Sequence, residues 1–104
     1  MKLTEKQKQK IYQKIELEGK KIVLLDVLGL KDMSQEELNA NIYCIDDSFD
    51  IIWQINPEPT KFEIDSFTSI KINEKKFIEA KRFSGFKYKI DLQSGKAKII
   101  EWDK

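Results

Sequence analysis

The last third of the chain constrains the fold more than any other stretch. In its third apolar run, Phe86, Tyr88, Ile90 and Leu92 alternate with charged residues, a period of two that predicts a strand with one buried face. Connections of two to four residues join neighbouring antiparallel strands. The stretch therefore predicts a four-stranded antiparallel meander over residues 67–102. Its runs are 67–72, 76–83, 86–92 and 97–102.

The N-terminal region has the signals of a helix. Thr4 and Gln7 have the spacing of a capping box, and Ile11 and Ile15 would share one helical face. Gly19 stands where a left-handed helix cap is wanted. We therefore expect an N-terminal helix within residues 1–19.

The middle of the chain predicts further strands. Residues 21–28 are apolar and rich in β-branched side chains, as in a buried strand. Residues 41–55 have the pattern of a hairpin with strands 42–45 and 51–55. Ser34 and Glu37 repeat the capping spacing and favour one helical turn over 34–39. Pro57 and Pro59 exclude a central strand, so we expect a loop or sheet edge there.

At 104 residues the chain is long enough for one core, and we expect residues 1–104 to form a single domain. The predicted fold is α+β and mainly β. An N-terminal helix (1–19) is followed by a strand and first hairpin (21–56) and by the meander (67–102). About seven antiparallel strands in meander order would form a twisted sheet or a small sandwich.

Missing residue types argue against catalysis. The chain has no histidine, which removes the commonest general base and the usual zinc ligand. Its single cysteine, Cys44, lies in a strand pattern typical of a small buried hydrophobe. We expect no enzyme activity, no metal and no cofactor.

No apolar run is long enough to span a membrane, since the run over 22–30 is interrupted by Asp26 and Gly29. The basic N-terminus leads into no apolar signal core. We therefore expect a cytoplasmic protein without a membrane partner.

The charges are unevenly distributed along the chain. Residues 1–21 hold seven Lys and three Glu (+4), residues 22–70 two Lys and ten acids (−8), and residues 71–104 ten Lys/Arg and five acids (+5). Folding either separates these charges into opposite surfaces or lets them neutralise each other, and the sequence leaves both open.

Two segments resemble each other. Both contain Tyr-x-Ile-Asp, then a turn, then Ile-Ile and a tryptophan: Tyr43 to Asp46 with Trp53, and Tyr88 to Asp91 with Trp102. The pattern is similar to the blade endings of β-propellers of the pyrroloquinoline-quinone dehydrogenase type, in which a glycine-rich turn follows the Asp. Two such hairpins cannot close a propeller, which needs at least about four blades. The resemblance implies a meander and no quinone chemistry. The overall layout also resembles small bacterial immunity-type proteins, which are encoded beside toxins.

Four residues are candidates for contact with a partner. Asp46, Asp47 and Asp50 form the densest carboxylate cluster, but they lack the glycine and closing glutamate of a calcium loop. The cluster is either a solvated turn or a contact for a basic partner. Trp53 is either a packing residue or, if exposed, an interface anchor.

A second candidate surface is basic. Lysines and one arginine in neighbouring strands would share an outer sheet face, as on a platform for single-stranded nucleic acid or on a merely solvated face. These residues are Lys71, Lys81, Arg82, Lys87, Lys89 and Lys98.

We expect a non-catalytic protein-binding module whose partner is another protein. Its specific form would be a bacterial immunity protein that neutralises a cognate toxin by binding it. Two alternatives stay open: a nucleic-acid-binding module that uses the basic face, and a structural protein that assembles by pairing a sheet edge.

Overall fold

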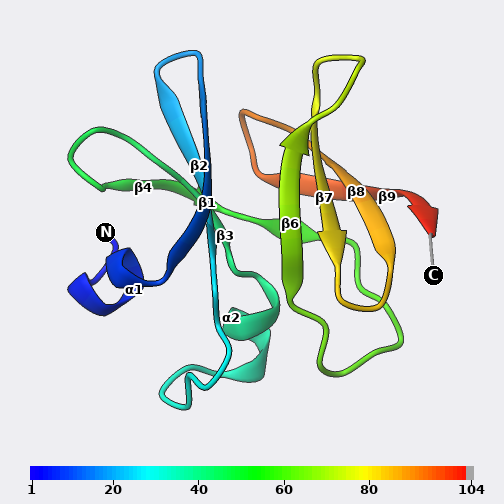
Figure 1. Cartoon of the computed structure of the whole chain (residues 1–104), viewed down its shortest axis with the longest axis horizontal. Helices are drawn as coiled ribbons and strands as arrows, with labels where there is room; N and C mark the ends of the chain where they lie inside the picture. The colour runs from blue at the N-terminus through cyan, green and yellow to red at the C-terminus, as the bar shows by residue number, and fades with distance from the viewer. Residues whose placement is uncertain (103–104) are drawn as a thin grey trace.

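The computed structural model describes residues 1–102 and contains two β-sheets and two short helices (Figure 1). The first sheet has the order β1-β2-β3-β4, and the second has the order β5-β9-β8-β7-β6. The fold is therefore α+β and mainly β, as predicted, with nine strands instead of about seven. The elements are α1 (Glu5–Gln9), β1 (Ile11–Leu17), β2 (Lys20–Leu25), α2 (Gln35–Asn39), β3 (Ile42–Ile45), β4 (Ile51–Gln54), β5 (Asn56–Pro57), β6 (Phe67–Ile72), β7 (Ile78–Arg82), β8 (Phe86–Ile90) and β9 (Lys96–Trp102).

The predicted helix over residues 1–19 is wrong beyond residue 9. The capping box exists, because the Gln7 amide donates to Thr4 Oγ1 (3.1 Å) and the Thr4 amide donates to Gln7 Oε1 (2.8 Å). The chain then becomes strand β1, in which half-buried and exposed residues alternate. Glu18 (φ 53°) and Gly19 (φ 76°) form the two-residue turn into β2, as a tight hairpin requires. Pairing with β2 brings Ile15 and Leu17 against the core, which a short polar helix could not do.

The two central strands of the first sheet, β2 and β3, are buried on both faces. In β2 and β3, alternate residues such as Ile22 and Cys44 face the second sheet, whereas Val23 and Tyr43 face the opposite side. Leu3, just before α1, is buried against that opposite side. The short N-terminal segment therefore acts as a third layer.

The second sheet confirms the predicted meander. Strands β6 to β9 pair in chain order, all antiparallel. The two-residue strand β5 adds a parallel pairing to β9, so the prediction of antiparallel strands alone needs this correction. Pro57 lies at the sheet edge, where a residue without an amide hydrogen is tolerated.

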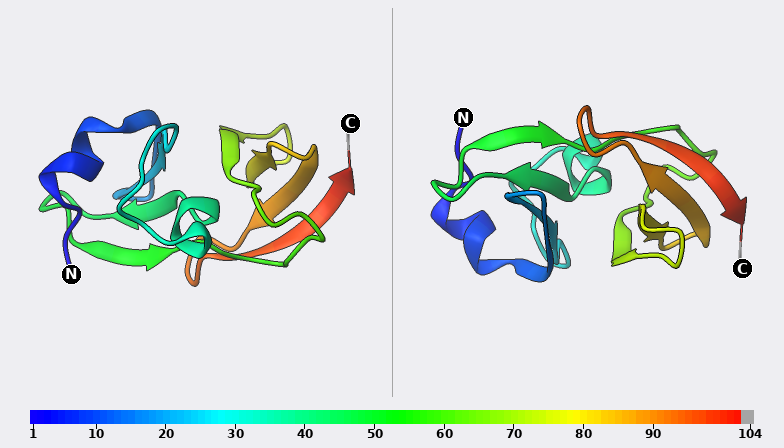
Figure 2. Two further views of the ribbon diagram at one scale, coloured as in Figure 1. Left: turned by 90° about the horizontal axis from the view of Figure 1, so that it is seen from below. Right: turned by 90° about the horizontal axis from the view of Figure 1, so that it is seen from above.

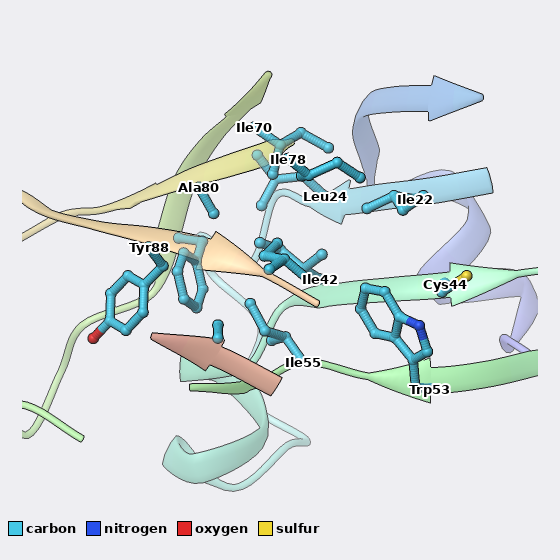
Figure 3. Packing of buried hydrophobic residues seen from close by; sticks show 13 residues of the cluster. Ile22, Leu24, Ile42, Cys44, Trp53, Ile55, Ile70, Ile78, Ala80 and Tyr88 are labelled. Atoms are coloured by element: carbon cyan, nitrogen blue, oxygen red, sulfur yellow. The ribbon is translucent and has the colours of Figure 1, made fainter. Parts of the chain in front are cut away.

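The two sheets pack over a shared apolar core, and side chains from β2 and β3 lie against those from β7 and β8 (Figure 3). Both sheets are strongly curved (Figure 2). On one side the chain runs directly from β4 through Ile55 into β5 and so joins the two sheets. On the other side β1 lies beside β6, where the Ile70 amide donates to Gln13 Oε1 at 2.7 Å. The result is a small sandwich. None of the helices within residues 1–102 is long and apolar enough to cross a membrane.

Candidate functional site

The acidic turn between β3 and β4 is held by its own side chains. Asp46 Oδ1 accepts hydrogen bonds from the Ser48 amide (2.8 Å) and the Asp50 amide (3.0 Å), which fixes the turn. Two lysines from the N-terminal hairpin region approach the other carboxylates: Lys21 Nζ lies 3.3 Å from Asp47 and Lys2 Nζ lies 3.9 Å from Asp50. Part of the charge of this turn is therefore balanced within the chain. Contact between Asp46, Asp47 or Asp50 and a partner stays a prediction.

Trp53 packs between the sheets. Only 7% of its surface is exposed, and its indole Nε1 donates to the Leu92 carbonyl at 2.8 Å (Figure 3). A Cβ atom added at Gly95 would lie 2.6 Å from the Trp53 ring, so the β8–β9 turn needs a glycine where the ring contacts it. A partner could reach Trp53 only if the sheets separated locally at this point.

The internal similarity holds for the two turns and not for the two tryptophans. Asp91 accepts from the Gln93 amide (3.2 Å), as Asp46 does from Ser48. Asp91 also accepts from Ser94 Oγ at 2.7 Å, and this bond together with the Gln93 amide lowers the pKa of the Asp91 carboxyl. Trp102 is 52% exposed and stacks on Phe86, with ring centroids 5.4 Å apart. It therefore has no role like that of Trp53.

The only cysteine is a core residue. Cys44 is fully buried in the interface between the sheets, and this desolvation raises the pKa of its thiol. A thiol in such surroundings is a poor nucleophile. Within residues 1–102, histidine, cysteine, aspartate and glutamate form no group of three or more that could hold a metal ion.

Arg82 was expected on the basic outer face, and this expectation is wrong. The side chain is 95% buried on the inner face of β7, in phase with Ile78 and Ala80. Its guanidinium donates to the Tyr88 hydroxyl (3.0 Å) and to the Asn39 carbonyl (3.2 Å). The alternation of apolar and polar residues in β7 was a signal that could have placed Arg82 on the inner face.

The five lysines that were expected on the outer face together with Arg82 do lie there. We call this outer face of the second sheet the lysine face (Lys71, Lys81, Lys87, Lys89 and Lys98). Strand register places Lys71, Lys89 and Lys98 in one row across the sheet, with Glu79 among them. Two ion pairs interrupt the positive charge, Lys71 with Glu79 at 3.6 Å and Lys87 with Glu101 at 3.4 Å. The basic C-terminal segment thus forms one surface that is rich in lysine and also carries acidic side chains.

A third surface was missed from the sequence. Tyr12, Leu28 and Phe83 are 66%, 84% and 79% exposed, and all three line one groove of about 410 Å³. We call it the apolar groove. Its other lining residues include Asp26, Val27, Ser66 and Thr68, so it lies between the loop after β2, strand β6 and the β7–β8 turn.

Nothing in the local pattern marks the apolar groove, because its three exposed side chains come from segments far apart in the sequence. One partial signal was available. Leu28 and Phe83 are apolar residues that follow the ends of β2 and β7 and stand just before Gly29 and Ser84.

Comparisons with known proteins place the chain in a family without giving it an activity. No curated protein and no solved structure matches it. One family model matches residues 4–102, and that family is described as a domain of unknown function, DUF7957. Because the match covers nearly the whole sequence, the chain belongs to the DUF7957 family.

Proposed function

We propose that this chain is a non-catalytic protein-binding module that contacts its partner through the apolar groove. The observation that carries the proposal is the exposure of Tyr12, Leu28 and Phe83 around one hollow. Exposed apolar side chains scattered singly are ordinary on protein surfaces, but a contiguous set marks an interaction site. Tyrosine is also enriched among residues that dominate binding energy.

The charge near this groove suggests the chemistry of the partner. Residues 1–70 contain the whole first sheet, β5 and the start of β6, and they hold nine Lys and thirteen acids, a net charge of −4. Asp26 lies in the groove lining itself. Complementary charge steers association and excludes wrong partners. The partner is therefore a protein with an apolar anchor side chain on a basic surface.

The finer proposal is that this partner is a bacterial toxin and that the chain neutralises it in the cytoplasm as an immunity protein. It is supported by the small size of the chain and by its resemblance to proteins of that kind. In this account the gene for the partner lies beside the gene for this chain. The product of the neighbouring gene is therefore the protein to use as a probe.

The test is a binding titration by calorimetry with the purified product of the neighbouring gene. Leu28→Asp and Phe83→Asp each remove an apolar contact and add a charge, and we expect each to weaken binding by at least about tenfold. Ile64→Asp is the matched control, because Ile64 is 71% exposed but does not line the apolar groove. We expect it to bind as the wild type does. No binding by the wild type, or an equal loss in the control, would overturn the proposal.

The acidic turn is the competing contact, and the same titration separates it. Asp47→Lys and Asp50→Lys reverse charges without removing the Asp46 carboxylate that fixes the turn. If these variants lose binding while Leu28→Asp and Phe83→Asp keep it, the partner contacts the acidic turn. The groove proposal would then be wrong.

Assembly through a sheet edge has less structural support. The facing edges of β1 and β6 lie beside each other, and the Ile70 amide already has Gln13 as its acceptor. An edge with such partners is a poorer template for a further strand. Sedimentation of the chain alone as a stable dimer would favour assembly over a separate protein partner.

A further inference from the structure

A larger groove lies at the opposite end of the molecule, between turns of the two sheets, and it extends to Lys89 and Lys98 of the lysine face. It has a volume of about 1020 Å³, at the upper limit of the range of about 300–1,000 Å³ that is usual for ligand clefts. The turns β1–β2, β6–β7 and β8–β9, all near the top of Figure 1, surround it. The loop after β2 and the β7–β8 turn, which flank the apolar groove, lie lower in the same view.

The floor of this groove is aliphatic. Ile78 and Ile90 are buried beneath it, Ile99 and Leu92 are partly buried, and Ile100 is 45% exposed. Its only aromatic lining residue is Phe77. Such a floor suits aliphatic side chains, whereas the bases of single-stranded nucleic acid need several aromatic platforms on which to stack.

The rim is basic. Among residues 1–102 it carries the lysines of three segments and two acids, Glu18 and Asp91. The Asp91 carboxylate accepts hydrogen bonds from Ser94 Oγ and the Gln93 amide and keeps its negative charge, so the rim carries four lysines against two acids. The lysines are Lys76, Lys89, Lys96 and Lys98.

At least two of these ammonium groups are available. Neither Lys76 nor Lys98 forms an ion pair with any residue in the range 1–102, and both are exposed. Lys89 lies over the Phe77 ring, 4.9 Å from its centroid. Positive charge is therefore spread around an aliphatic hollow.

From this combination we infer that the large groove binds an extended segment of a partner protein in which aliphatic and acidic side chains alternate. The aliphatic side chains occupy the floor, and the carboxylates meet the lysines on the rim. Several cations from separate segments fit several carboxylates, whereas a fatty acid offers only one. The inference does not depend on the apolar groove, which lies elsewhere and on the acidic part of the chain.

The test uses fluorescence anisotropy with a labelled short peptide of alternating leucine and glutamate. We expect saturable binding by the full chain that weakens as salt is added, since the contacts between charges are exposed. Lys98→Glu and Ile100→Asp should each reduce affinity about tenfold. Lys75→Glu is the matched control, because this exposed lysine belongs to the same turn as Lys76 and does not line the groove. It should leave affinity unchanged.

Comparison ligands complete the experiment. A peptide with lysine in place of glutamate, and one with serine in place of leucine, should both fail to bind. Tighter binding of decanoate or of oligo-deoxythymidine than of the acidic peptide would overturn the inference, as would no binding of the peptide or equal losses in Lys75→Glu. Leu28→Asp in the apolar groove should not affect this peptide, so the two binding proposals can fail separately.

Discussion

The two sheets have similar strand numbers and differ in what covers their outer faces. On the first sheet, Val23, Leu25, Tyr43 and Ile45 form a second apolar cluster, which Leu3 helps to cover. On the second sheet the outer face is the lysine face, and no such apolar cluster was found on it among residues 1–102. One sheet is a central layer and the other an outer one.

This difference explains the two kinds of sequence pattern. Strands β2 and β3 have long fully buried runs because both of their faces are packed, whereas β7 and β8 alternate because one face contacts water. The first sheet therefore contributes buried side chains to two clusters, and the second sheet to the shared one. The two surfaces that we propose for recognition are the apolar groove and the large groove, which lie at opposite ends of the molecule.

The largest expected effect is at the shared core. Leu24→Ala removes a side chain that is 1% exposed, and we expect a loss of about 2–5 kcal/mol in the free energy of unfolding. Urea denaturation followed by circular dichroism measures it. Ile72→Ala, at a 46% exposed position in β6, is the control and should cost much less. Equal losses would contradict the placement of Leu24 in the shared core.

Next is the N-terminal cover of the first sheet. Leu3 is 3% exposed against the outer cluster, so Leu3→Ala should cost about 2–3 kcal/mol even though the residue lies outside every strand and helix. The same denaturation experiment gives the value. A loss below about 0.5 kcal/mol, as for ordinary surface positions, would show that the segment is not a structural layer.

A smaller effect tests the contact between the sheets at Trp53. Gly95→Ala introduces a Cβ at 2.6 Å from the Trp53 ring and also strains a backbone with φ +78°. Gly19→Ala has a similar φ of +76° but no atom within 4 Å of its Cβ, so it isolates the cost of the backbone. We expect Gly95→Ala to destabilise the chain by about 1–3 kcal/mol more than Gly19→Ala. Equal destabilisation would mean that Trp53 moves aside freely.

The smallest effect is expected on the lysine face. Lys89→Ala removes an exposed ammonium group and its contact with Phe77, and the free energy of unfolding should change by no more than about 0.5 kcal/mol. Thermal denaturation at low and moderate salt checks it. A loss of more than about 2 kcal/mol would show that this face takes part in packing.

Local patterns predicted the second sheet well and failed where contacts are distant in sequence. The alternation of β8 fixed the core face around Tyr88 without further information. The spacing of Ile11 and Ile15 fits a helix and a strand equally. The capping box at Thr4 is real and favoured the helix, whereas the structure has a strand at these residues. Gly19 fits a helix cap in the sequence, and in the structure it stands in the two-residue turn of the β1–β2 hairpin.

Other features depend on partners that sequence alone does not bring together. Gly95 has the form of an ordinary turn glycine, and only the fold shows that Trp53 needs the space beside it. The apolar groove joins Tyr12, Leu28 and Phe83 from three separate segments. The charge imbalance was visible, but its partial neutralisation through Lys21 and Asp47 was not.

Hydrogen exchange of the full chain, free and bound to the product of the neighbouring gene, tests the central claim most directly. The account predicts that binding slows amide exchange at residues 26–30, 66–68 and 83–85, which flank the apolar groove, and leaves the acidic turn at 46–50 unchanged. Slower exchange at 46–50 with no change around Leu28 and Phe83 would contradict it.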